Sequence, residues 1–159
     1  MKSKIRKVNI EVVPLSEVPA EAIDVLQKAN ADVHQQTKAP LILIVDDEPL
    51  IADTLSAILQ LHGFATTTAY DGLSALKMAR RFFPSLLITD VAMPGMNGVE
   101  LARAVTQMRP ECGVILFSAH ASSVELVREQ CKLGPKLLFL QKPVHPEVMV
   151  MRVSDLLTA

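Results

Sequence analysis

Leu41-Ile-Leu-Ile-Val45, followed directly by Asp46-Asp47-Glu48-Pro49, is the stretch that decides the fold class of this chain. An uninterrupted run of leucine and β-branched residues is typical of a strand that is buried on both faces. The acidic turn and the proline indicate that the chain then enters a helix, because proline is favoured in the first helical turn. A buried strand that leads at once into a helix predicts an α/β protein with a parallel sheet.

The same alternation continues to the end of the chain. Apolar residues at helical spacing predict a helix over Pro49–His62, which Gly63 ends. Further helices are predicted from Asp71 to Arg81, from Asn97 or Gly98 to before Pro110, from Ser122 or Ser123 to Gly134, and after Pro146. The other strands are predicted at Phe64–Thr68, Ser85–Thr89, Gly113–Phe117 and Lys136–Leu140. We therefore expect an α/β sheet of five parallel strands with five helices.

The N-terminal residues do not follow this alternation. Ile5–Val13 has the composition of a strand, and Ala20–His34 carries apolar residues at helical spacing. The polar stretch His34–Lys38 and the proline that follows it provide a joint. We divide the chain into an N-terminal extension, residues 1–39, and a main domain, residues 40–159. The extension is expected to be flexible or partly helical, as a docking segment, a dimerisation arm or a disordered tail.

Composition excludes several classes of protein. The 16 Lys and Arg residues nearly balance the 17 Asp and Glu residues, so total charge indicates neither a broad nucleic-acid-binding face nor an acidic tail. Cys112 and Cys131 lack the spacing of metal ligands and are too few for a disulfide scaffold, which favours a reducing cytosol. No apolar run approaches the roughly 20 residues that span a bilayer. We expect a cytoplasmic protein with no membrane contact and no direct nucleic-acid partner.

Polar side chains follow the predicted strands at one edge of the sheet. Asp46 and Asp47 follow the first strand, Asp90 the third, Ser118 the fourth and Lys142 the fifth. Ligands of open α/β sheets bind outside the carboxyl ends of the strands. Three carboxylates at one point repel each other unless a hard cation with oxygen ligands, most naturally magnesium, neutralises them. With a hydroxyl and an ammonium beside them, the set suits phosphoryl transfer to a carboxylate, with Asp90 as nucleophile.

Each of these residues also has an ordinary explanation. An acidic triplet after a strand is most often a solvated turn, and Asp90 alone would be a helix cap. A lone Ser118 is more often a hydrogen-bonded hydroxyl at a strand end. Their joint placement at one edge is what favours phosphoryl chemistry.

Four motifs, LILIVDDEP, LLITDVAMPGMNGVEL, VILFSAH and FLQKPV, resemble those of the receiver domains of two-component response regulators, over about Pro40 to Ala159. The resemblance implies a flavodoxin-like, doubly wound sheet of strand order 2-1-3-4-5, for which this family is a known example. It implies a phosphorelay signalling protein that catalyses only its own phosphorylation and dephosphorylation. The phosphoryl donor would be a sensor histidine kinase or a histidine phosphotransfer protein, and the output a downstream protein target or a homodimer.

The resemblance also assigns roles to residues. Asp90 matches the phosphoacceptor. Asp46 and Asp47 match the acidic pair that holds Mg²⁺, with Asp47 as the direct ligand and Asp46 acting largely through water. The remaining roles are a metal-ligating backbone carbonyl at Ala92, a switch hydroxyl at Ser118, the phosphate-pairing amine of Lys142, an aromatic switch at Phe139, and a cis peptide bond before Pro143.

Departures from the family pattern are few. Ala92 and His120 occupy positions that tune dephosphorylation, and Gly134-Pro135 stands where the family often has a Gly-Ala pair. The chain ends just after the last predicted helix, so we expect no C-terminal output domain.

Three other functions stay open. A flavodoxin-like cofactor binder would need a glycine- and hydroxyl-rich phosphate loop where Asp46-Asp47-Glu48 stands. A haloacid-dehalogenase-like phosphatase would carry its nucleophilic aspartate after the first strand, with a second aspartate two residues on. A pseudo-receiver would keep the fold but not respond to phosphate, and the complete set of acids, hydroxyl and lysine argues against it.

Overall fold

The computed structural model describes residues 39–119 and 136–158. The chain divides into two units, Met1–Lys38 and Ala39–Ala159, and all described residues belong to the second. The elements expected over Ile5–Val13 and Ala20–His34, and the helix expected from Ser122 or Ser123, lie outside the described residues. His120 and Cys131 lie outside them as well.

The described strands form one parallel sheet in the order β2-β1-β3-β4-β5. They are β1 (Leu41–Val45), β2 (Ala65–Ala69), β3 (Leu86–Asp90), β4 (Gly113–Ser118) and β5 (Leu137–Gln141). β1 pairs with β2 on one side and with β3 on the other, so the strand order reverses at β1. The predicted class and strand order are confirmed. In open α/β sheets, ligands bind outside the carboxyl ends of the strands at such a reversal, which here are the ends of β1 and β3.

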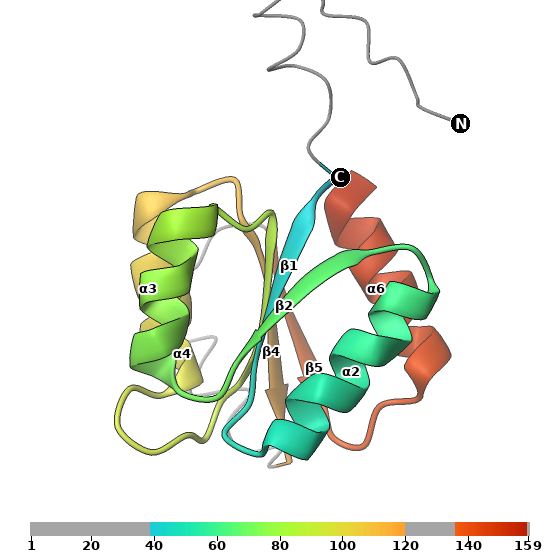
Figure 1. The fold of residues 1–159 in the computed structure, drawn as a ribbon, viewed down its shortest axis with the longest axis horizontal. Helices are drawn as coiled ribbons and strands as arrows, with labels where there is room; N and C mark the ends of the chain where they lie inside the picture. Colours follow the sequence, from blue (N-terminus) through green and yellow to red (C-terminus); the bar gives the residue numbers. More distant parts are fainter. Residues whose placement is uncertain (1–38, 120–135, 159) are drawn as a thin grey trace, which may run out of the picture. The chain divides into compact units, whose positions relative to one another are not determined.

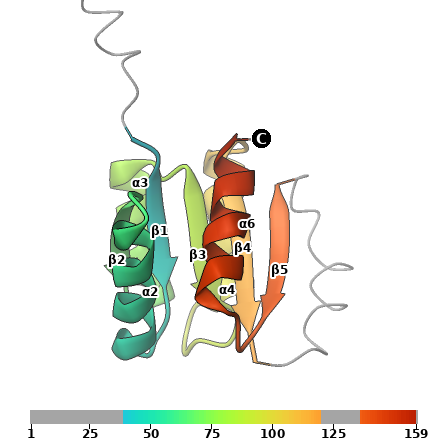
Figure 2. The same cartoon turned by 90° about the vertical axis from the view of Figure 1, so that its right-hand side faces the viewer.

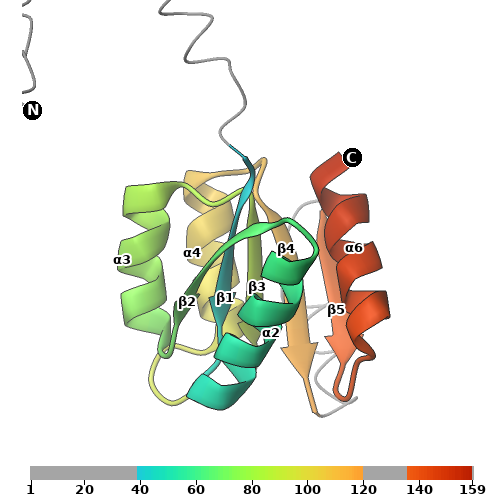
Figure 3. The ribbon, with the colours of Figure 1, turned by 45° about the vertical axis from the view of Figure 1, so that its right-hand side comes forward.

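Helices cover both faces of this sheet. The described helices are α2 (Pro49–Leu61), α3 (Gly72–Phe82), α4 (Gly98–Met108) and α6 (Pro146–Thr158). α3 and α4 lie on one face, and α2 and α6 lie on the other (Figures 1 and 3). Figure 2 looks onto the second face, with α2 and α6 in front of the strands. None of the helices in the described part of the chain is long and apolar enough to cross a membrane.

The buried core has two halves, one on each side of the sheet. Leu43 and Val45 of β1 pack into a cluster with residues of α3 and α4. Ile42 and Ile44, which alternate with them, pack into a second cluster with residues of α2 and α6. Because successive side chains of a strand point to opposite faces, a strand between two helix layers must be apolar at every position. This is the physical reason for the uninterrupted run that opens the domain.

The helix starts follow the predicted capping residues. The Asp71 side chain accepts a hydrogen bond from the backbone N of Ser74 at 2.7 Å and begins α3. Asn97 and Glu100 form a reciprocal capping box at the start of α4. α2 ends at Leu61, and Gly63 after it has a φ of +86°, a conformation that favours glycine.

Four of the five strands end one residue later than predicted. Asp90 and Ser118, which we expected to follow their strands, are instead the last residues of β3 and β4. The backbone ladder continues to them, because Asp90 pairs with Phe117 and Ser118 pairs with Gln141. Ladder hydrogen bonds use the backbone alone, so a polar side chain does not end a strand. Both residues are therefore held by the sheet and not by a loop.

Candidate functional site

The ammonium of Lys142 joins two carboxylates at the carboxyl edge of the sheet. Its Nζ lies 2.8 Å from Oδ2 of Asp46 and 2.8 Å from Oδ1 of Asp90. Asp46 directly follows β1 and Asp90 ends the neighbouring β3, whereas the lysine comes from the turn after β5. Asp46 is only 3% exposed and Asp90 only 7%. Carboxylates so far removed from water need a nearby counter-charge, and Lys142 supplies it.

The other carboxylate oxygens bind backbone N–H groups. The N–H of Glu48 donates to Oδ1 of Asp46 at 3.0 Å, and the N–H of Ala92 donates to Oδ2 of Asp90 at 2.9 Å. Each bond reaches two residues forward, the pattern of an Asx turn. Together with the two contacts of Lys142, these two bonds fix the orientation of both carboxylates. In Asp90, one oxygen contacts the ammonium of Lys142 and the other accepts a hydrogen bond from the N–H of Ala92.

Lys142 is held in its charged form. Burial by itself lowers its pKa, but the hydrogen bonds to Asp46 and Asp90 and the charge attraction of these two carboxylates together outweigh this effect and raise the pKa above its ordinary value. The Nζ also lies 4.8 Å from the centroid of the Phe117 ring. One positive charge thus faces two negative charges, which leaves the edge with an excess of negative charge.

A glycine allows the backbone after Asp90 to fold closely onto α4. A Cβ at Gly98 would lie 1.9 Å from the carbonyl oxygen of Asp90. The Gly98 N–H donates to the carbonyl of Val91 at 3.0 Å, and the Thr89 hydroxyl donates to the carbonyl of Asp90 at 3.0 Å. From the sequence alone, Gly98 was a possible helix start, and its close approach to Asp90 was not predicted. A glycine in the first turn of a helix, where it has low propensity, was the signal that could have identified this close approach.

The other predicted site residues lie around this centre. Ser118 is buried at the end of β4, and its carbonyl accepts a hydrogen bond from the backbone N of Lys142 at 2.7 Å. The Lys142–Pro143 peptide bond is cis. Phe139 is half-buried in β5 and packs against the core on the α3–α4 face. Asp47 and Ala92 are exposed at the same edge.

The donors for a metal ion are few. Across residues 39–119 and 136–158, no group of three or more His, Cys, Asp or Glu side chains could hold a metal ion. The available donors are the carboxylates of Asp46 and Asp90, together with exposed Asp47. Magnesium is often bound through one or two carboxylates, with water and phosphate oxygens as its remaining ligands. Oxygen donors and uncompensated negative charge therefore fit magnesium better than a metal that requires a closed protein cage.

Comparison with known protein families and sequences gives consistent matches. The family model for the response regulator receiver domain matches residues 42–154. The probable transcriptional regulatory protein TcrX of Mycobacterium tuberculosis is 33% identical over 116 residues, which cover 73% of this chain and 49% of that protein. The transcriptional regulatory protein CreB of Escherichia coli is 34% identical over 119 residues, covering 73% and 50%. The chain spans about half the length of these curated relatives.

Solved structures share the same architecture. A CheY-like receiver domain protein from Methanospirillum hungatei JF-1 has a TM-score of 0.70 at 27% identity, covering 76% of this chain and 95% of that one. The chemotaxis protein CheY4 of Vibrio cholerae has a TM-score of 0.66 at 29% identity, covering 74% and 98%. The similarity therefore covers nearly the whole of both solved chains.

Proposed function

Because the chain belongs to the response regulator receiver domain family, and so contains the receiver domain of a two-component system, we propose that Asp90 accepts a phosphoryl group from a phosphohistidine donor in a magnesium-dependent reaction. The observation that carries this proposal is the environment of the Asp90 carboxylate. It is nearly buried, with Lys142 at 2.8 Å from one oxygen and the amide of Ala92 at 2.9 Å from the other.

In the proposed reaction an oxygen of Asp90 attacks the phosphorus atom of the donor. The new P–O bond forms as the P–N bond to the imidazole breaks, and the imidazole nitrogen keeps the electron pair. Lys142 stabilises the negative charge that the phosphoryl oxygens bring to the buried edge. The hydroxyl of Ser118 is proposed to donate a hydrogen bond to one of these oxygens.

Magnesium would be held by Asp46, Asp47, Asp90 and the carbonyl of Ala92, where its charge would offset that of the phosphoryl oxygens. What the chain itself provides is a pre-arranged set of oxygens. Backbone N–H groups already hold the carboxylates of Asp46 and Asp90 in place.

The output is proposed to be a change of surface. Phosphorylation adds about −1.5 to −2 charges at Asp90. Ser118 would move toward the phosphoryl group, and Phe139 would turn into the space that this leaves. The altered face would include β5 and α6, where Val148 and Met151 are exposed. The phosphoryl group shifts an equilibrium between two conformations only by as much as it favours one of them.

The proposed partners follow from this scheme. The donor is a sensor histidine kinase or a histidine phosphotransfer protein, and the receiver of the output is a downstream protein or a second copy of the chain. Relatives such as the protein MtrA of Mycolicibacterium smegmatis are named as DNA-binding response regulators. The match covers only 48% of that protein, so its DNA binding does not carry over to this chain. We therefore do not propose direct nucleic-acid binding.

Intact-mass spectrometry tests the phosphoacceptor. Incubation with acetyl phosphate and Mg²⁺ should add one phosphoryl group to the native protein and none to Asp90→Asn. Asp155→Asn, which changes an exposed carboxylate on α6, is the matched control and should be labelled like the native protein. Chelation of Mg²⁺ should stop labelling. Equal labelling of Asp90→Asn and the native protein would show that Asp90 is not the acceptor.

A further inference from the structure

Phe117 touches the site but has no role in the scheme above. Its ring centroid lies 4.8 Å from the Nζ of Lys142, within the range of a cation–π contact. It is also the residue of β4 that pairs with Asp90 of β3. Residues paired in register on neighbouring parallel strands point to the same face of the sheet, so Phe117 and Asp90 stand side by side.

The path of Lys142 explains why this position matters. The lysine follows β5, whereas Asp90 ends β3, and β4 lies between these two strands. Neighbouring strands are about 4.8 Å apart, so the lysine side chain must cross β4 to reach Asp90. The β4 residue in register with Asp90 is Phe117. The ammonium therefore reaches its carboxylates over an aromatic ring.

We propose that Phe117 is a positioning residue for Lys142, whose ammonium it holds by a cation–π contact at the place where it binds both Asp46 and Asp90. This inference rests on the proposed function, because the benefit is to phosphoryl transfer onto Asp90. An aliphatic residue at this position would still pack against the lysine stem but would not attract the charge. The lysine would then spend less time between the two carboxylates.

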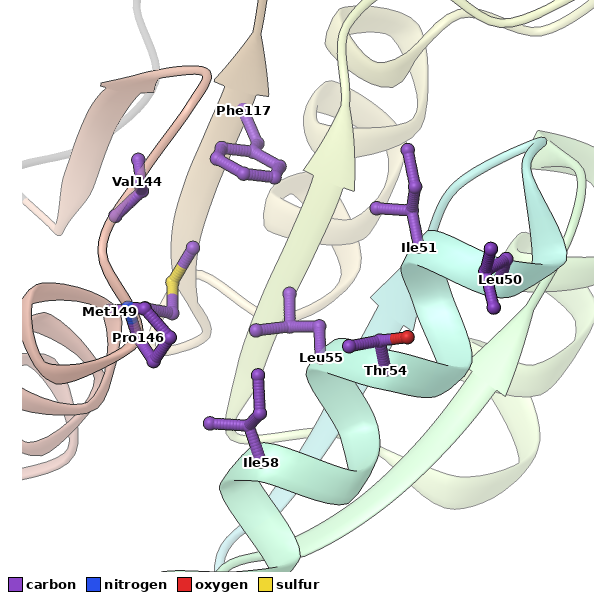
Figure 4. A pocket seen from close by; sticks show the side chains of 9 residues that line it. All are labelled: Leu50, Ile51, Thr54, Leu55, Ile58, Phe117, Val144, Pro146 and Met149. Atoms are coloured by element: carbon purple, nitrogen blue, oxygen red, sulfur yellow. The ribbon is translucent and has the colours of Figure 1, made fainter.

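The surroundings of Phe117 make the idea testable without loss of the fold. Its half-buried ring lines an apolar groove of about 350 Å³ between α2 on one side and α6 with the loop before it on the other. Figure 4 shows the ring between Ile51 on one side and Val144 on the other. Because the groove is open space and not close-packed core, a smaller side chain here leaves only a modest additional cavity.

The rate of labelling by acetyl phosphate and Mg²⁺ is the first measurement. Phe117→Leu should slow labelling about three- to tenfold, the loss expected for one cation–π contact, and Phe117→Tyr should stay close to the native rate. Phe64→Leu is the matched control, because Phe64 packs against the same core cluster but lies next to β2. It should label at the native rate. A Phe117→Leu rate equal to the native rate would overturn the proposal.

Two further readouts separate positioning from a purely structural role. In a Lys142→Met background, Phe117→Leu should cause no additional slowing, because Phe117 acts through the lysine. In NMR spectra, the Hε protons of Lys142 should be shifted upfield by the ring in the native protein and in Phe117→Tyr, but not in Phe117→Leu. An undiminished effect of Phe117→Leu in the Lys142→Met background, or no upfield shift in the native protein, would overturn the proposal. The NMR shift needs no phosphorylation, so it tests the contact even if Asp90 is not the acceptor.

Discussion

The two edges of the sheet differ in the burial of their ion pairs and in the residue found where the backbone is sterically restricted. At the carboxyl edge, Lys142 pairs with two nearly buried carboxylates, and Gly98 allows two backbone segments to meet. At the amino edge, Arg109 pairs with Glu111, and both side chains are considerably more exposed. There a bulky Phe83, with a φ of +51°, occupies a left-handed position that favours glycine.

This difference shows where the chain is constrained. An exposed ion pair contributes little to stability, and a strained residue in an exposed turn is tolerated as long as the fold has stability to spare. Buried charges without complete partners are costly, so the carboxyl edge can persist only with its lysine and its amides in place. The buried charges, which are costly without their partners, lie at the edge where phosphoryl chemistry is proposed. The more exposed ion pair and the strained turn lie at the opposite edge.

The largest expected effect comes from Gly98→Ala. The added Cβ would overlap the carbonyl of Asp90, so we expect the free energy of unfolding to fall by about 3 kcal/mol. Gly95→Ala, in the loop just before α4, is the control, because Gly95 has open space around it and only its φ of +72° opposes a side chain. Its cost should be about 1 kcal/mol. Urea denaturation of both variants measures the difference, and equal losses would mean that the close approach at Gly98 does not matter.

A second effect concerns the two ion pairs. Breaking a fully buried pair costs about 3–5 kcal/mol, which partial exposure of the lysine should reduce to about 2 kcal/mol for Lys142→Met at neutral pH. Because the folded-state pKa of Lys142 is raised, its contribution is complete below the ordinary value of 10.5 and is lost as pH rises through the folded pKa. The difference in unfolding free energy between the native protein and Lys142→Met should therefore shrink as the pH rises above 10.5.

Arg109→Gln is the counterpart at the amino edge. The same urea titrations should show a clearly smaller loss for this variant than for Lys142→Met at neutral pH, since its pair with Glu111 is more exposed and the guanidinium otherwise contacts the ring of Phe83. A loss as large as that of Lys142→Met would remove the contrast between the two edges.

The last expected effect has the opposite sign. Phe83→Gly should raise the unfolding free energy by less than about 1 kcal/mol, because glycine adopts the left-handed conformation without strain and this gain exceeds the loss of the ring contact with Arg109. Phe82→Gly should instead lower it by about 1 kcal/mol, because Phe82 is the last helical residue of α3 and glycine is a poor helix former. Thermal denaturation of the two neighbours distinguishes the signs. Destabilisation by both would mean that the Phe83 side chain contributes more than its strain costs.

Much of the fold could be predicted because its signals are local. The unbroken apolar run of β1, the capping residues Asp71 and Asn97, and Gly63 after α2 each act within a few residues of themselves. Strand ends were less predictable. Asp90 and Ser118 belong to their strands because the neighbouring strand offers ladder partners, and side-chain polarity does not show this. The roles of Gly98 and Phe117 were not predicted for the same reason. Each depends on a contact with another segment, with the carbonyl of Asp90 for Gly98 and with the ammonium of Lys142 for Phe117.

The sequence alone therefore determined the class of fold and the types of residue at the carboxyl edge, because periodicity and strand-terminal polarity can be recognised within short segments. The tertiary structure decided which of these residues meet. Lys142 binds Asp46, 96 positions earlier in the chain, and lies over Phe117 on the way to Asp90. Such contacts depend on the order and register of strands far apart in sequence, and backbone hydrogen bonding together with packing sets that order and register across the whole sheet.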